Sequence, residues 1–455
     1  MQDAVGLGRG RIRGMTTAPV LAIVGAGSLN WGRHIAIDLL TNPAFAQAEL
    51  RLIDIDAERV SLVHRWVVLV ARHLGLTQRI TATTDLRTGL TGCTGCITGI
   101  AVGGDRLWRY DALYPQLDGI FQPVGDSIGI GGAIRALRHA PALRRIAVTL
   151  SEVGGHEPVL LQVANPLNVL TAAVSDLPRL RVVGYCHGHD DTAQIIAQAL
   201  GVDRSTTRVA CDVAGNNHNI AVTSLEIGER SYDQAGIASL APRIFDCPWR
   251  EVAYGRYGVL IGNYARHPVE YLPGFITAEH GYGRAWGIPP IAEQIDPLLP
   301  PRQDRAREDL LARLTAAEAD PAVIATWGYE IAHSREPLDH ILAAFHTGHR
   351  WRGTLNVFNQ GAIAGVDADA HVELPCIIEG GRVVRQSVHL PERFTAEVAR
   401  VGREQAMLAR CCRAYDEDLL VEALALDALM PSDRTVIRRI AREMVAFQRD
   451  LIGAS

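Results

Sequence analysis

The sequence predicts an α/β fold, with a doubly wound parallel sheet in the N-terminal part and a mixed α+β domain after it. Up to about residue 200, short apolar runs rich in Val and Ile alternate with helical segments. Each run is closed by a polar residue, Gly or Pro, as is typical of buried parallel strands. Beyond that point two strand-like runs flank a polar loop, and long helical stretches follow. This change of pattern indicates a second domain of different architecture.

The first strand–helix–strand unit has the order of a dinucleotide-binding unit. Strands are predicted over residues 21–24 and 50–53, with a helix over 31–40 between them. The first strand runs into the turn Gly-Ala-Gly-Ser at 25–28, and the second strand ends at Asp54. Strand, glycine turn, helix, strand and terminal acid follow one another in dinucleotide-binding βαβ units.

The turn and the acid predict where the cofactor binds. Gly25, Gly27 and Ser28 lie where the backbone must approach a pyrophosphate closely, and Asp54 is placed to accept hydrogen bonds from the adenosine ribose. Asn30 holds the place of the third glycine in G-x-G-x-x-G. A plain turn before a helix is therefore the alternative, and the flanking strands and the acid favour dinucleotide binding.

Three further apolar runs end in breaks that are candidate site loops, because ligands of such sheets bind beyond the carboxyl ends of the strands. They are 96–102 before Gly103, 159–163 before Asn165, and 181–185 before Cys186. We assign Gly103 to the cofactor site.

The second part of the chain predicts a mixed domain. Strands are expected over 208–213 and 220–227, an extended stretch over 372–388, and helices over 305–318 and 395–427. The chain is thus divided into an N-terminal extension (1–17), a cofactor-binding domain (18–200) and a domain for substrate binding, catalysis and oligomerisation (201–455).

The composition excludes several classes of protein. The 455 residues include 45 Lys+Arg and 50 Asp+Glu, so the net charge is −5, which provides no basic field for nucleic acid or for an anionic membrane. No run reaches the roughly 18 apolar residues of a membrane span. The first residues contain arginines but no apolar core of a signal peptide. Eight cysteines are too few for a secreted disulfide framework, so we expect a cytoplasmic protein.

Several cysteine and histidine residues are candidates for metal binding. Cys93 and Cys96 form a C-x-x-C pair without a second pair nearby, so an ordinary buried pair is favoured over a redox or zinc site. Cys186 and His218 follow two different strands and could hold a divalent metal jointly. A buried small thiol and a satisfied core histidine are the alternatives.

Seven motifs in order along the chain resemble those of glycoside hydrolase family 4, the NAD- and metal-dependent glycosidases, and most closely its α-galactosidase/α-glucuronidase branch. The similarity extends over about residues 21–430. The motifs are GAGS at 25–28, GDSIGIGG at 125–132, NPL at 165–167, GYCH at 184–187, AGNNH at 214–218, NVFNQG at 356–361 and VELP at 372–375.

The resemblance implies a Rossmann-like domain in a lactate/malate dehydrogenase-like architecture, and a redox-assisted hydrolysis. NAD⁺ would oxidise sugar C3, a base would remove the C2 proton, the C1 group would leave, water would add, and NADH would return the hydride. By the same resemblance, Cys186 and His218 are the metal ligands, with Mn²⁺ the family's usual ion and Fe²⁺, Co²⁺ or Ni²⁺ also suited to a thiolate. Asn165 and Asn217 would bind sugar hydroxyls, unless they are turn residues.

The family's base is a tyrosine in the first part of the second domain. Four tyrosines are available there: Tyr254, Tyr257, Tyr264 and Tyr271. We prefer Tyr264, whose pKa would need to be lowered by a metal or by Arg266, and an aromatic packing role is the alternative. His187 is the candidate acid for the leaving oxygen, with Asp190 in reserve. His187 could equally orient a neighbouring group.

The chain departs from the branch at the expected sugar site, in residues 188–191, at 216 and in 263–267. Polar and cationic additions such as His189 and Arg266 suit an acidic sugar, a uronide or a sulfonated sugar, and a galactoside is the alternative substrate. Arg135 and Arg138 could meet an anion as well. For both arginines, however, the sequence favours solvated side chains on an amphipathic helix.

Three functions are compatible with these observations. The first is a glycosidase acting on a small-molecule glycoside, without nucleic-acid or membrane partners, and a homodimer or homotetramer as in the family. The second is a sugar or cyclitol dehydrogenase or epimerase that uses the same C3 oxidation and that would accumulate NADH. The third is a catalytically idle NAD-binding protein, against which the retained Cys186 and His218 argue.

Overall fold

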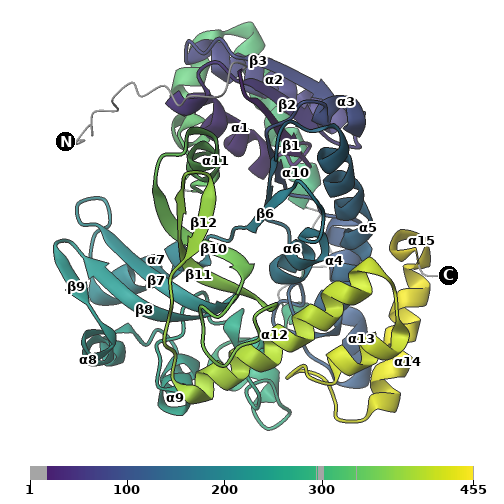
Figure 1. Ribbon diagram of the computed structural model, residues 1–455, viewed down its shortest axis with the longest axis vertical. Helices are drawn as coiled ribbons and strands as arrows, with labels where there is room; N and C mark the ends of the chain where they lie inside the picture. Colours follow the sequence, from purple (N-terminus) through teal and green to yellow (C-terminus); the bar gives the residue numbers. More distant parts are fainter. Residues whose placement is uncertain (1–17, 294, 296–301, 335, 454–455) are drawn as a thin grey trace.

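One mixed twelve-stranded sheet forms the centre of the protein (Figure 1). The structure, a computed structural model, describes residues 18–293, 295, 302–334 and 336–453. Along the sheet the strands are ordered β3-β2-β1-β4-β5-β6-β10-β11-β7-β8-β9, and β12 pairs with β11. The predicted extension, residues 1–17, lies outside the described residues.

The N-terminal half of the sheet is parallel, as predicted from its Val- and Ile-rich runs. Its strands are β1 (Val20–Val24), β2 (Glu49–Ile53), β3 (Arg79–Thr83), β4 (Gly95–Thr98), β5 (Val159–Gln162) and β6 (Arg181–Gly184). Their carboxyl ends share one edge, so the turns that begin at Gly25, Asn165 and Cys186 open on the same side.

The C-terminal half is antiparallel and joins the parallel half through β10, where Asn356 pairs with Gly184. Its strands are β7 (Val209–Asn216), β8 (Asn219–Ile227), β9 (Arg230–Tyr232), β10 (Trp351–Phe358), β11 (His371–Glu379) and β12 (Arg382–Arg385). The mixed second half is confirmed. The domain boundary near residue 200 stays a prediction, because the sheet runs across it.

Helices cover both faces of the parallel half, and Figure 1 shows the long α12 crossing the molecule below the sheet. The helices are α1 (Trp31–Thr41), α2 (Ala57–His73), α3 (Leu86–Leu90), α4 (Gly104–Leu113), α5 (Gly129–Val153), α6 (Leu167–Val174), α7 (Gly188–Leu200), α8 (Gln234–Ile244), α9 (Pro248–Tyr257), α10 (Arg302–Ala319), α11 (Leu338–Thr347), α12 (Glu392–Arg413), α13 (Glu417–Leu424), α14 (Arg434–Phe447) and α15 (Arg449–Ile452).

Two predicted elements have different bounds. The strand expected over 96–102 ends at Thr98, because the chain turns at Gly99, where a Cβ would lie 2.4 Å from the Trp31 ring. The helix expected over 395–427 is two helices, α12 and α13. The break follows from Asp416, whose side chain accepts a hydrogen bond from Leu419 N and caps the second helix.

The apolar core lies on both faces of the sheet. Cys93 and Cys96 are completely buried in it, and all eight cysteines are free. No helix among the described residues is long and apolar enough to cross a membrane.

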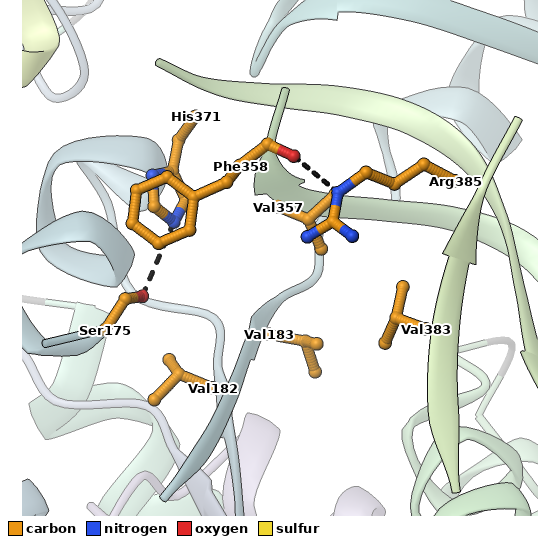
Figure 2. A pocket seen from close by; sticks show the side chains of 8 residues that line it. All are labelled: Ser175, Val182, Val183, Val357, Phe358, His371, Val383 and Arg385. Carbon is orange, nitrogen blue, oxygen red and sulfur yellow. Dashed lines mark hydrogen bonds between the residues drawn. The ribbon is translucent and has the colours of Figure 1, made fainter. Parts of the chain in front are cut away.

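A cavity of about 150 Å³ lies beside β6, β10, β11 and β12 (Figure 2). It is lined by Ser175, Val182, Val183, Val357, Phe358, His371, Val383 and Arg385. None of the site residues predicted from the sequence lines it, so the candidate site lies elsewhere.

Candidate active site

The glycine turn after β1 has the close backbone contacts that a dinucleotide site requires. Gly25 has φ +89°, and a Cβ there would lie 2.5 Å from the carbonyl oxygen of Gly99. A Cβ at Gly32, in the first turn of α1, would lie 2.7 Å from Ala26 O. Gly32 therefore permits the close approach of helix and turn that the third glycine of the usual motif provides, two positions after Asn30.

Asp54 holds this turn from the end of β2. Its Oδ2 accepts a hydrogen bond from Gly27 N at 2.7 Å, and its Oδ1 accepts one from Asp56 N at 3.0 Å. The next residue, Ile55, is 94% exposed and offers an apolar surface beside the turn. Gly103 lies at the start of α4 with φ +79°, where a Cβ would collide with the Leu107 side chain.

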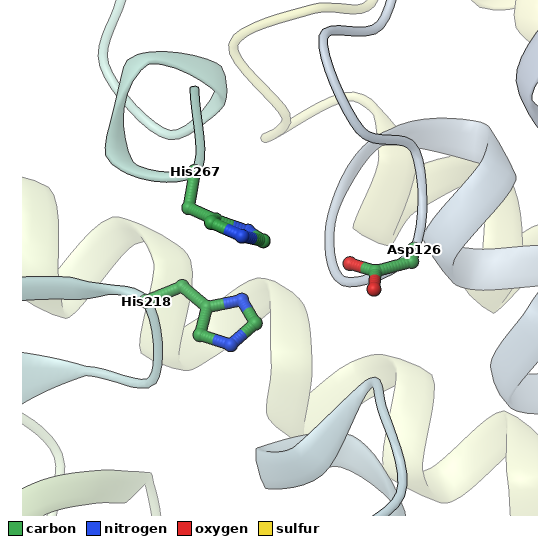
Figure 3. Close-up of side chains that lie close together, drawn as sticks. All are labelled: Asp126, His218 and His267. Carbon is green, nitrogen blue, oxygen red and sulfur yellow. The ribbon is translucent and has the colours of Figure 1, made fainter. Parts of the chain in front are cut away.

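Three side chains from segments far apart in the sequence face one another (Figure 3). Asp126 precedes α5, His218 lies in the turn between β7 and β8 at φ +69°, and His267 precedes a short 3-10 helix. One potential ligand atom of each lies within 4.8 Å of those of the other two. Two imidazoles and a carboxylate at this spacing can hold a divalent metal ion.

Ser127 orients two of these side chains. Its hydroxyl donates to Asp126 Oδ1 at 2.6 Å and lies 3.1 Å from His218 Nδ1. Because the Ser127 hydroxyl donates its proton to Asp126, it accepts a hydrogen bond from the Nδ1–H of His218. The Nε2 lone pair of that imidazole is then free for a ligand.

The ionisation of the cluster suits a cation. Burial lowers the pKa of His218 and of His267, so both imidazoles are neutral, the form that binds metals. Burial would raise the pKa of Asp126, but the two imidazoles when protonated, Arg135 and the hydrogen bond from Ser127 outweigh it and hold that pKa below its usual value. The cluster is one carboxylate with two neutral donors.

Glu270 fixes the distance between two of the contributing segments. It is buried, and its Oε1 accepts hydrogen bonds from Val124 N at 2.6 Å and Gly125 N at 3.0 Å. These bonds fasten the loop that carries Asp126 to the segment that carries His267.

Cys186 is not one of the three members of this cluster. Burial and then the Glu373 carboxylate raise the pKa of the thiol, while the amide of Asn217 lowers it. Asn217 Nδ2 donates to Glu373 Oε2 at 3.0 Å, and burial raises the pKa of Glu373 to about 7. Asn217 thus connects the Cys186 loop with His218, its neighbour in sequence. The pairing of Cys186 and His218 on one metal stays a prediction.

Asn165 belongs to the same site. Its Nδ2 donates to Asp126 Oδ2 at 3.2 Å, and its carbonyl oxygen accepts from Arg135 Nε at 3.1 Å. The structure therefore brings together Asn165, Asn217, His218 and, through Asn217, Cys186.

The candidate acid and base lie on adjoining loops. His187 Nε2 is 3.3 Å from Asp191 Oδ2, and the hydrogen bond to Asp191 raises the pKa of His187 despite its burial. Asp190, the reserve acid, forms an ion pair with Arg204 at 2.5 Å. Tyr264 is 47% exposed, and burial and Asp191 raise its pKa although Arg266 lowers it. The protein's own groups do not supply the lowered pKa that we expected.

Comparison with known proteins decides the family. Residues 20–202 match the model described as "Family 4 glycosyl hydrolase", and residues 213–430 match "Family 4 glycosyl hydrolase C-terminal domain". The chain belongs to glycoside hydrolase family 4. The resemblance inferred from the motifs, the glycosidase class and the α/β fold are confirmed.

Three proteins similar to this family 4 hydrolase have different names and substrates. It is 28% identical to an α-galactosidase of Rhizobium meliloti (strain 1021), over 94% of this chain and 88% of that protein. It is 25% identical to an α-galacturonidase of Bacillus subtilis (strain 168), over 93% and 96% of the two chains. A 6-phospho-β-glucosidase of Thermotoga maritima, solved with manganese, NAD⁺ and glucose-6-phosphate, superposes with a TM-score of 0.71 at 18% identity, covering 95% of this chain and 99% of that one.

The two arginines predicted to bind substrate in this family 4 chain have different surroundings. Arg138 is completely buried, and its guanidinium bonds to Asp111, Val102 O and Gln448. The alternative of a solvated arginine on an amphipathic helix is wrong for Arg138, because α5 is enclosed by α4, α12 and α15. Arg266 is exposed next to His267, and no hydrogen bond or ion pair joins it to the described residues.

Sequence reasoning assigned no role to Asp126, His267 or Glu373, although Asp126 and Glu373 lie in two of the motifs that resemble the family. The available signal was chemical. Asp126 and Glu373 are each the acid within an otherwise small or apolar motif, such as Gly-Asp-Ser at 125–127. The spacing along the chain gave no indication that the three would meet His218 or Cys186.

Proposed function

We propose that this family 4 hydrolase is an NAD- and divalent-metal-dependent glycosidase whose preferred substrate is an α-linked galacturonide or a closely related acidic sugar. The observation that carries this proposal is the Asp126–His218–His267 cluster. Asp126 bonds to Asn165 beyond the carboxyl end of β5, and the glycine turn follows the carboxyl end of β1 at the same sheet edge. A hydride acceptor and a Lewis acid would then bind next to one another.

The residues present fit both groups. The glycine turn closes only without side chains at Gly25 and Gly32, and the exposed Ile55 follows Asp54 as an apolar surface for an adenine ring. The neutral imidazoles and the carboxylate match a divalent ion such as Mn²⁺, with Cys186 as a further donor. The Thermotoga relative contains both manganese and NAD⁺, which supports the same pair here.

When bound, NAD⁺ supplies reversible oxidation at sugar C3 and the metal supplies a Lewis acid for the sugar oxygens. The chain's own residues supply the proton transfers. Tyr264 removes the proton from C2, which the C3 carbonyl has acidified. His187 gives a proton to the departing oxygen, and the Asp191 carboxylate beside it favours its protonated form. Asn165, already bonded to Asp126, orients a sugar hydroxyl.

The preference for an acidic sugar rests on Arg266. Its exposed guanidinium lies between Tyr264 and His267 in sequence and is not engaged by another described residue. A hexuronide carboxylate can accept two parallel hydrogen bonds from such a group. That one of the relatives is an α-galacturonidase supports the same choice.

The test is hydrolysis of matched nitrophenyl α-galacturonide and α-galactoside, with NAD⁺ and Mn²⁺ added together, singly or not at all, under reducing conditions. We expect cleavage only with both additions, faster with the uronide, and without net NADH. Accumulation of NADH with a keto sugar would instead show a dehydrogenase. Cleavage that needs neither NAD⁺ nor metal would contradict the proposal.

Cys186→Ser separates the metal from the cofactor. We expect this variant to lose metal-dependent turnover and to retain NAD⁺ binding, measured by fluorescence titration. Unchanged turnover would remove the thiol from the metal site while leaving the three-residue cluster in place.

A further inference from the structure

A second cluster of potential metal ligands lies where α11 packs against α1. Its members are His333, Asp339 and His340, and one ligand atom of each lies within 4.8 Å of those of the others. Asp339 and His340 are in the first turn of α11, and His333 lies on the segment that leads into it. Figure 1 shows α1 and α11 next to each other in the cofactor-binding half.

Asp339 is the centre of this cluster. It is 1% exposed, and its Oδ2 accepts a hydrogen bond from Asn42 Nδ2 at 2.8 Å. The Nε2 atoms of His333 and His340 lie 3.2 Å and 3.9 Å from the same oxygen. Its other oxygen, Oδ1, is buried without a hydrogen-bond partner, a costly state for a carboxylate.

The orientation of His333 is set by backbone. Its Nδ1 forms a short hydrogen bond with the carbonyl oxygen of Ser334, which accepts the Nδ1 proton. Ser334 is in turn fixed by the buried Asp38, which accepts from its backbone N at 2.7 Å and its hydroxyl at 2.5 Å. A histidine whose Nδ1–H is given to a carbonyl presents the Nε2 lone pair, the usual arrangement of a metal-bound imidazole.

The electron-pair-bearing atoms of this cluster therefore call for a positively charged group between them. With Nδ1 protonated, His333 Nε2 and Asp339 Oδ2 are two acceptors 3.2 Å apart. Every ion pair that Asp38 and Asp339 make within the described part of the chain is with a histidine. A proton on Nε2 would satisfy one contact, whereas a divalent ion would satisfy both imidazoles, Oδ2 and the orphaned Oδ1 together.

We propose that His333, Asp339 and His340 form a second divalent-metal site, suited to Zn²⁺ or a similar borderline ion, that fastens α11 to α1. Two imidazoles and a carboxylate are ligands that zinc prefers, and a fourth position remains for water. Two residues of the α1 region position these ligands: Asn42 donates a hydrogen bond to Asp339, and Asp38 accepts one from Ser334, next to His333. The site is separate from the Asp126–His218–His267 cluster and does not depend on the proposed glycosidase activity.

The experiment counts zinc in the full chain without an affinity tag, in a His218→Gln background that weakens the other cluster. After equilibrium dialysis against micromolar Zn²⁺, elemental analysis should give about one more ion per chain for His218→Gln than for the same protein with His333→Gln and His340→Gln. His349→Gln, at an exposed histidine of the same region, is the matched control and should lose none.

A thermal scan supplies the second readout. Zn²⁺ should raise the unfolding temperature of the His218→Gln protein, and His340→Gln alone should reduce that rise, since a ligand that binds only the folded state stabilises it. His340 is exposed, so its substitution leaves the fold intact. Equal zinc counts with and without the two histidines would overturn the site and leave a protonated His333 as the bridge.

Discussion

The two clusters of potential metal ligands differ in which of their members are buried. In Asp126–His218–His267 the central imidazole is buried and the carboxylate is half-buried, whereas in His333–Asp339–His340 the carboxylate is buried and both imidazoles are exposed. The first unites three loops that are distant in sequence, and the second lies within eight consecutive positions. We therefore expect the first cluster to meet a substrate at the sheet edge and the second to join α11 to α1.

The largest expected effect is on the rate of glycoside cleavage, which should depend on the first cluster and not on the second. His218→Gln should reduce the rate of glycoside cleavage by about 10³-fold, because the neutral imidazole and its ion would no longer polarise the sugar oxygens. His340→Gln should leave that rate unchanged. Initial rates with NAD⁺ and Mn²⁺ measure both, and equal losses in the two variants would end the distinction.

The variant Tyr264→Phe tests whether Tyr264 is the base that removes the C2 proton. If the phenolate removes the C2 proton, kcat should fall by about 10²-fold with little change in KM. Tyr257→Phe is the matched control, since Tyr257 is buried against Phe394 and serves packing. Full activity in Tyr264→Phe would move the base to another group, and the buried Glu373, with its pKa raised to about 7, would be examined next.

Arg266→Gln tests the sugar that the first cluster serves. Loss of a charge-assisted pair is worth about 1.5–3 kcal/mol, so kcat/KM for the galacturonide should fall roughly 10–100-fold. The value for the neutral galactoside should not change. Arg266→Lys, which keeps the charge but not the planar fork, should lie between the two. A parallel fall for both sugars would show that Arg266 does not recognise the carboxylate.

The smallest effect concerns pH. The hydrogen bond that His187 donates to the Asp191 carboxylate raises the pKa of His187, so the protonated acid persists to higher pH and activity is lost as the pH rises through that pKa. Asp191→Asn lowers the pKa, and the alkaline limb of the kcat/KM profile should move to lower pH. An unmoved limb would assign it to another group and return His187 to an orienting role.

The fold was predictable where the signal is local. The turn at Gly25–Ser28, Asp54 and the Val- and Ile-rich strands are fixed by backbone conformation and burial within short segments, and these elements are as expected apart from the early end of β4. Arg138 shows the limit of such reasoning. Its position on α5 gave no sign that Asp111 and Gln448 would enclose it.

The site was only partly predictable, because some of its residues meet through contacts between distant segments. Cys186, His218 and Asn165 were found because each follows a strand, and the parallel ends of β5 and β6 share one edge. Asp126 and His267 joined His218 through Ser127 and Glu270, contacts between segments that no spacing in the sequence connects. The second cluster, by contrast, is local enough to be visible as His-x₅-Asp-His.

The central claim is that the glycosidic bond breaks only after the neighbouring carbon has lost its proton. Hydrolysis of the α-galacturonide in D₂O, followed by NMR of the released sugar, tests this directly. We predict deuterium at C2 of the product. When NAD⁺ is omitted, we expect neither cleavage nor incorporation of deuterium. A product cleaved at the full rate with its C2 hydrogen retained would contradict the account.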